Sequence, residues 1–203
     1  MEIGEYPFAK RYGWVEDRYG VNWQLILTDP SGEARPLVVP SLMFTKGVAG
    51  QADQAIESYT SLFPDSRRGQ TARYPPGTPD AGTLMFADFQ LCGQWFAAMD
   101  SADPGHAFSF TEGVSLLVEC DTQQEMDRLT EALSAVPAAE QCGWLKDRFG
   151  ISWQITPRAL QQMMRDGTRA QVDAVTQAFL PMKRLDVAAI RAAYEGQAPR
   201  AKA

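Results

Sequence analysis

Two segments of the chain have apolar residues three and four positions apart, which is the spacing of one face of an α-helix. The apolar stripes are Ala52, Ile56, Tyr59 and Phe63 in the first segment and Met126, Leu129 and Leu133 in the second. Pro64 follows the first stripe and predicts its end. Asp121 or Thr122 precedes the second stripe, and either side chain could cap that helix.

Five other segments are rich in β-branched and aromatic residues and predict strands. They are residues 38–44, 66–74, 83–91, 94–99 and 114–119. Taken with the helices, the order is strand, helix and three strands, followed by strand, helix and a terminal hairpin. The pattern therefore predicts one βαβββ unit and a second, shortened one.

A stretch of fourteen residues occurs twice. Gly13–Ile26 returns 130 positions later as Gly143–Thr156, with seven of the fourteen positions identical. Such self-similarity indicates a repeated structural element. Each copy predicts a β-hairpin whose turn is Asp-Arg-aromatic-Gly, with the glycine at a position that needs positive φ.

After Pro157 the chain becomes rich in Ala, Gln, Met and Arg, and its apolar residues keep helical spacing. This pattern predicts two or three amphipathic helices. Gly167 and Pro181 are the expected break points between them.

Composition limits the class of protein. A chain of 203 residues with 45% hydrophobic content supports one main domain. The 25 acidic and 19 basic residues are spread without long runs and give a net charge of −6, so nucleic acid is not an expected partner. The three cysteines lack the paired spacing of a disulfide framework or redox site, which predicts reduced thiols. No signal peptide or bilayer-length apolar run is found, so we expect a cytoplasmic protein without a membrane partner.

Four segments together resemble a known family. They are Pro-Ser-Leu-Met-Phe at 40–44, Ala-Ile-Glu-Ser-Tyr-Thr-Ser-Leu-Phe-Pro-Asp-Ser at 55–66, Leu-Val-Glu-Cys-Asp at 117–121 and the second hairpin. They are similar to the PhnB-like branch of the vicinal oxygen chelate superfamily, which includes glyoxalase I, extradiol dioxygenases, fosfomycin-resistance enzymes and bleomycin-binding proteins. The resemblance implies an α+β fold in which paired βαβββ units form a cupped mixed β-sheet. It divides the chain into an N-terminal hairpin (1–30), a glyoxalase-fold domain (37–157) and a helical C-terminal extension (158–203).

The sequence departs from the family in two places. Only residues 136–141 separate the second helix from the last hairpin, where the family has another strand, so we expect that strand to be missing. The N-terminal copy resembles the end of a preceding domain. We hypothesise that this hairpin pairs with an exposed sheet edge and fills a gap there, in its own chain or in a partner.

The family's metal ligands are His or Glu on four strands. The resemblance places Pro40, Ser115 and Gln154 at three of those positions and leaves Asp100, near the end of a strand, as the remaining candidate. Proline has no donor atom, serine is a poor ligand, and an amide oxygen binds transition metals more weakly than carboxylate or imidazole. We therefore predict no metal site and no cofactor. The lone histidine, His106, lies in a Pro-Gly turn and is expected at the rim.

The resemblance implies a metal-independent protein that binds a small apolar or aromatic molecule in the sheet cup, as a homodimer. The candidate pocket residues are Met43, Asp100, Ser115, Glu119, Ser152 and Gln154. A lyase or isomerase that uses Asp100 or Glu119 as a general base stays open as an alternative, as does an interaction module acting through the helical tail. Whether the protein is an enzyme is thus undecided. No glycine-rich turn follows a strand, so the sequence does not support a nucleotide-type methyl-donor site.

Overall fold

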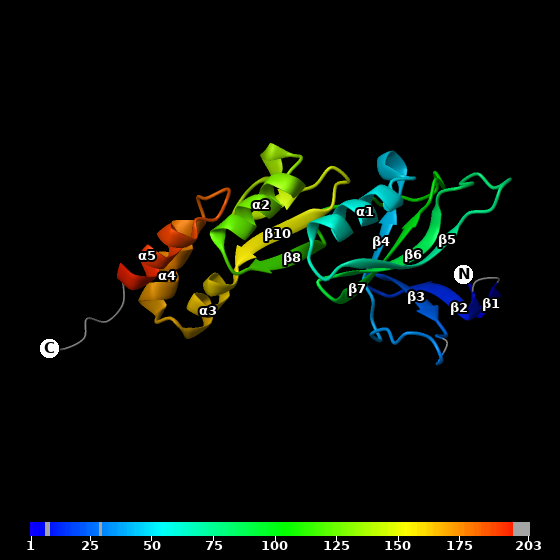
Figure 1. The fold of residues 1–203 in the computed structure, drawn as a ribbon, viewed down its shortest axis with the longest axis horizontal. Helices are drawn as coiled ribbons and strands as arrows, with labels where there is room; N and C mark the ends of the chain where they lie inside the picture. Colours follow the sequence, from blue (N-terminus) through cyan, green and yellow to red (C-terminus); the bar gives the residue numbers. More distant parts are fainter. Residues whose placement is uncertain (7–8, 29, 197–203) are drawn as a thin grey trace. The chain divides into compact units, whose positions relative to one another are not determined.

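A computed structural model describes residues 1–6, 9–28 and 30–196 of the chain (Figure 1). The chain divides into two compact units, Met1–Val39 and Pro40–Ala203. The first unit is an antiparallel sheet of β1 (Gly4–Tyr6), β2 (Ala9–Glu16) and β3 (Asn22–Ile26), in the order β1-β2-β3. The repeated segment is therefore a hairpin, as predicted, and the preceding residues add a third strand.

The second unit begins with a complete βαβββ arrangement. It consists of β4 (Ser41–Phe44), the short 3-10 helix η1 (Lys46–Val48), α1 (Ala52–Leu62), β5 (Arg67–Arg73), β6 (Leu84–Leu91) and β7 (Gln94–Asp100). The strand order is β4-β7-β6-β5, and β4 runs parallel to β7 while the other pairs are antiparallel. The sheet is therefore mixed, because the helix connection returns the chain in the same direction.

A shortened version of the same arrangement follows. It consists of β8 (Ser115–Cys120), α2 (Gln123–Leu133), the 3-10 helix η2 (Pro137–Ala139), β9 (Trp144–Lys146) and β10 (Ser152–Pro157). The strand order is β8-β10-β9, with β8 parallel to β10. No strand lies between α2 and β9 in this fully described stretch, which confirms the predicted loss. Figure 1 shows α1 and α2 on the same side of the two sheets.

Three further helices complete the second unit: α3 (Arg158–Asp166), α4 (Arg169–Phe179) and α5 (Val187–Gly196). Their breaks fall at Gly167 and before Pro181, as predicted. Leu160, Val175 and Ile190 are buried in the core of the unit. Among the residues that the structure describes, no helix has the length and apolar character needed to cross a bilayer.

The apolar stripes of α1 and α2 face the core. Ala52, Ile56 and Tyr59 are almost completely buried, as are Met126 and Leu129. Thr122 is the N-cap of α2, since its side chain accepts a hydrogen bond from the Glu125 backbone amide. This result decides between the two expected caps and satisfies one of the free amides of the first turn.

The gap left by the missing strand is closed by the connection that replaces it. Ala135 donates its backbone N–H to the carbonyl of Lys146 at 2.9 Å. Gln141 and Trp144 exchange backbone hydrogen bonds at 3.2 and 2.8 Å. These bonds engage the backbone N–H and carbonyl of Trp144 and the carbonyl of Lys146 at the edge of β9 that does not pair with β10.

The turn of the second hairpin is fixed by one buried carboxylate. Asp147 Oδ1 accepts the backbone N–H groups of Phe149 and Ile151, each at 2.9 Å. Asp147 Oδ2 accepts Trp153 Nε1 at 2.8 Å and the Tyr59 hydroxyl of α1 at 2.5 Å. Gly150 in this turn has a φ of 87°, which confirms the predicted need for glycine.

We predict that Asp147→Asn lowers the free energy of unfolding by about 2–4 kcal/mol, because the amide replaces a charged acceptor and leaves buried donors unsatisfied. Chemical denaturation monitored by tryptophan fluorescence measures this loss. The matched control is Asp17→Asn, which changes the equivalent but solvent-exposed carboxylate of the first hairpin and should leave the main transition in place. Equal losses in the two variants would contradict the importance of burial.

Candidate functional site

The sheet of β8, β10 and β9, here called the second sheet, has two faces of different character, because side chains alternate along a strand. Trp153 and Ile155 of β10 face the core beneath the helices, and both are buried. The opposite face, here called the cup face, carries the alternate residues of β8 and β10. Its members are Ser115, Leu117 and Glu119 of β8 and Ser152, Gln154 and Thr156 of β10. Four of the six predicted pocket residues therefore share one face.

Polar groups gather at one end of the cup face. Ser152 lies directly opposite Ser115 in the parallel pairing of β8 and β10. Gln154 donates a hydrogen bond from Nε2 to Ser115 Oγ at 2.7 Å. Ser152 is only 2% exposed, and its Oγ has no hydrogen-bond partner within the described structure. A buried hydroxyl without a partner is unusual, and such a group requires a specific explanation.

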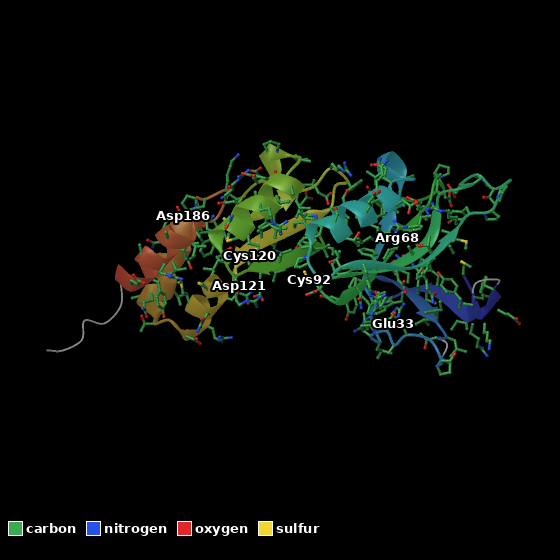
Figure 2. All side chains as sticks on the ribbon, in the orientation of Figure 1. Glu33, Arg68, Cys92, Cys120, Asp121 and Asp186 are labelled. Atoms are coloured by element: carbon green, nitrogen blue, oxygen red, sulfur yellow. The ribbon has the colours of Figure 1, made fainter. Side chains whose placement is uncertain are left out.

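Glu119 lies at the other end of the cup face and is engaged in an ion pair. Arg158, at the start of α3, contacts Glu119 Oε2 at 3.0 Å and Asp121 Oδ1 at 3.0 Å. Figure 2 labels Asp121 at the end of β8. Sequence reasoning missed Arg158, and only its place directly after the last strand could have pointed to this role.

Met43 and Asp100 belong to the sheet of β4, β7, β6 and β5, here called the first sheet, and they lie on opposite faces of it. Met43 pairs with Met99, whereas Asp100 pairs with Phe44, whose side chain is in the core. Asp100 therefore does not share the face of Met43, because neighbouring positions on a strand point to opposite sides.

The Asp100 carboxylate binds backbone amides. It accepts the N–H of Ala52 at the start of α1 and the N–H of Leu84 at the start of β6, each at 3.1 Å. Burial raises the pKa of this carboxyl, while the hydrogen bonds from the backbone amides oppose the rise. Both oxygens are thus occupied in holding elements of the fold together, at the helix N-terminus where a carboxylate is favoured.

The residues at the family's ligand positions have little affinity for a metal. The structure joins Ser115 and Gln154 to each other, and Pro40 precedes β4 without a donor side chain. His106 lies in the loop after β7, where its Nε2 is 3.0 Å from Ser101 Oγ. Among the described residues, no group of three His, Cys, Asp or Glu side chains could hold a metal ion. The donor set therefore does not match the sites that Zn²⁺ or similar ions prefer.

Two of the three cysteines, Cys92 and Cys120, are not placed as nucleophiles. Figure 2 labels Cys92, in the turn between β6 and β7, and Cys120, at the end of β8. Burial raises the pKa of the Cys120 thiol to about 12, with further contributions from Glu125 and Asp121. Burial also raises the pKa of Cys92. Because the thiolate is the reactive form, these environments suppress reactivity at neutral pH.

A small hollow on the other side of the second sheet is not connected with these polar groups. It lies between α2, β9 and residues 183–185, with Met126, Thr130 and Leu145 among the residues that line it. It is too small for a drug-sized molecule, so the cup face remains the candidate site.

One family model and several solved structures match the chain. A family model described as 3-demethylubiquinone-9 3-methyltransferase matches residues 36–156, more than half of the chain. A solved PhnB protein from Bacillus cereus is 35% identical, with a TM-score of 0.52, over 60% of this chain and 99% of that one. A protein from Staphylococcus aureus is 30% identical, over 61% and 97% of the two chains, with a TM-score of 0.29. A glyoxalase/bleomycin resistance protein from Albidiferax ferrireducens is 11% identical, over 59% and 97%, with a TM-score of 0.36. No curated protein matches the sequence.

The family match covers both βαβββ-type units and stops at the end of the last hairpin strand, just before α3. The first hairpin and the three terminal helices lie outside it. The chain therefore belongs to the PhnB family, which is described as 3-demethylubiquinone-9 3-methyltransferase.

Proposed function

We propose that this protein binds a small apolar or aromatic molecule at the cup face without a metal ion. The observation that carries the proposal is the Ser152 hydroxyl, which is buried and lacks a hydrogen-bond partner in the described structure, beside the Ser115–Gln154 pair. A ligand with one polar group would satisfy this hydroxyl once the side chains that cover it move aside on binding. Binding would then remove the cost of an unmade hydrogen bond in the free protein.

An apolar surface adjoins these polar groups. Leu117 pairs with Gln154 across the parallel strands and is 52% exposed. A small number of precisely placed polar groups beside apolar side chains is typical of small-molecule sites. Met43 on the first sheet is a further candidate contact, since a flexible thioether adapts to irregular apolar shapes.

The two carboxylates considered for acid–base catalysis have other partners. Asp100 accepts backbone amides at both oxygens, and Glu119 pairs with Arg158. A general base must lie within hydrogen-bond reach of the substrate proton that it removes. These contacts favour binding over a lyase or isomerase reaction that uses either group.

Two other activities have less support. The methyl transfer in the family's description is not part of this proposal, because the sequence has no G-x-G-x-x-G turn to hold a nucleotide-type methyl donor. The helical tail packs Leu160, Val175 and Ile190 into the core of its own unit, so its main apolar residues are not available to a partner.

We predict that a thermal-shift screen of benzene and indole derivatives bearing one hydroxyl or carbonyl will find compounds that raise the melting temperature. For such a compound, Ser152→Ala should weaken binding about 5- to 20-fold, the effect of one lost hydrogen bond. The same variant should unfold no more easily without ligand, because it removes a buried unsatisfied group. Isothermal titration and denaturation measure the two effects.

The matched control is Ser134→Ala, since Ser134 lies at the C-terminal end of α2, outside the β8 and β10 residues of the cup face, and donates to Glu140. This variant should leave ligand affinity unchanged. Failure of every compound at about 1 mM to shift the melting temperature, or equal affinity loss in the two serine variants, would contradict the proposal.

We also predict that the purified protein contains less than about 0.1 equivalent of any transition metal, because hydroxyl and amide groups at these positions bind such ions weakly. Elemental analysis checks the content. Treatment with a chelator should leave the melting temperature and ligand affinity unchanged, whereas a metal-dependent fold or site would lose both. A stoichiometric metal would refute the metal-independent proposal.

A further inference from the structure

The two hairpins have the same local structure. Val15 of β2 faces Trp23 of β3, and 130 positions later Leu145 of β9 faces Trp153 of β10. The neighbouring cross-strand pairs correspond in the same way. Both turns also contain a glycine with positive φ. The repeat therefore extends from sequence to strand register.

The hydrogen bonds of the two turns correspond, with one exception. Asp17 Oδ1 accepts the backbone amides of Tyr19 and Val21 at 2.9 and 3.0 Å, and Oδ2 accepts Trp23 Nε1 at 2.9 Å. These bonds match those of Asp147 in the second hairpin. One bond differs, because Asp147 Oδ2 also accepts a hydroxyl from Tyr59 of α1. Within the described part of the chain, Asp17 has no matching bond from a tyrosine on a helix.

Burial separates the two copies. Trp153 is 2% exposed, whereas Trp23 is 42% exposed. Phe149 is 2% exposed, whereas its counterpart Tyr19 is 76% exposed. The whole apolar face of the first hairpin is open in this way, and we call it the hairpin face. Its residues are Val15, Tyr19, Val21, Trp23 and Leu25. A contiguous exposed apolar face of this kind marks an interaction site.

The second hairpin shows which structure fits such a face. The ring of Tyr59 lies 5.2 Å from that of Trp153, and the ring of Phe63 stacks on Trp153 at 5.5 Å. Both residues come from the α1 region, four positions apart, so one helix supplies the hydroxyl donor and the stacked ring. In a second copy of this chain, Tyr59 already bonds to Asp147, so α1 of another copy is not free to cover the hairpin face.

We propose that the hairpin face docks an α-helix of another polypeptide, one that presents a tyrosine and a second aromatic residue four positions later. The tyrosine hydroxyl donates to Asp17, and the second ring packs on Trp23. The carboxylate at the centre of the face favours a partner with a hydrogen-bond donor over a purely apolar surface. The partner helix would contact the first hairpin in the way that α1 contacts the second hairpin.

The probe is a synthetic peptide with the sequence of residues 51–64, capped at both ends and cross-linked between positions 57 and 61 to hold the helix. Both positions are exposed in α1, so the link avoids the binding stripe. We expect fluorescence anisotropy with the full-length chain to give a dissociation constant on the order of 10–100 μM. Replacing the peptide's tyrosine by phenylalanine should weaken binding about 5- to 10-fold.

Trp23→Ala in the protein should weaken peptide binding at least about 10-fold, as expected for a central aromatic contact. Leu25→Lys tests the same face away from the turn, in case the first variant disturbs the hairpin. The matched control is Trp14→Phe, because Trp14 pairs with Gln24 and points to the opposite face from Trp23. This control should bind like the unchanged protein.

Three results would overturn the proposal. The first is no binding of the peptide at about 1 mM, and the second is binding that survives both Trp23→Ala and Leu25→Lys, which would place the peptide elsewhere. The third is self-association, detected by sedimentation, that both variants abolish while the peptide fails to bind, since a second copy would then occupy the hairpin face.

Discussion

The Asp147 carboxylate joins the two sheet-and-helix arrangements of residues 40–203. It lies in the turn of the second arrangement and accepts a hydroxyl from the helix of the first. Its other bonds fix the turn and the indole of Trp153, which packs against Tyr59 and Phe63. A buried charge is tolerated only when its acceptor sites are filled, so the turn, the indole and the helix must all be in place together.

The two copies of the hairpin show how much structure a short sequence determines by itself. Register, the positive-φ glycine and the Asx-type turn bonds are the same in both, because they depend on contacts within fourteen residues. Burial differs completely between Trp23 and Trp153. That property depends on what the fold places against the hairpin, and the local sequence has no information about it.

The difference between local and long-range contacts also explains which features of the molecule could be predicted from its sequence. Helical spacing identified the buried stripes of α1 and α2, and the short distance between α2 and the last hairpin revealed the missing strand. The cup-face position of Ser115 and Gln154 followed from alternation and family resemblance. The binding of Asp100 to the amides of Ala52 and Leu84 could not be foreseen, because these partners are 48 and 16 positions away in the chain. The pairing of Arg158 with Glu119 was missed for the same reason.

The bonds from Ala135 and Gln141 to β9 bear on how a sheet can become smaller during evolution. A sheet that loses its outermost strand normally gains a row of free amides and carbonyls, which invites aggregation. Here a connection of a few residues supplies replacement partners without forming a regular strand. The loss of a strand at this place therefore leaves fewer free backbone groups on the new edge than the loss of a strand alone would leave. Selection on the length of this segment would then act on the placement of two backbone contacts more than on its sequence.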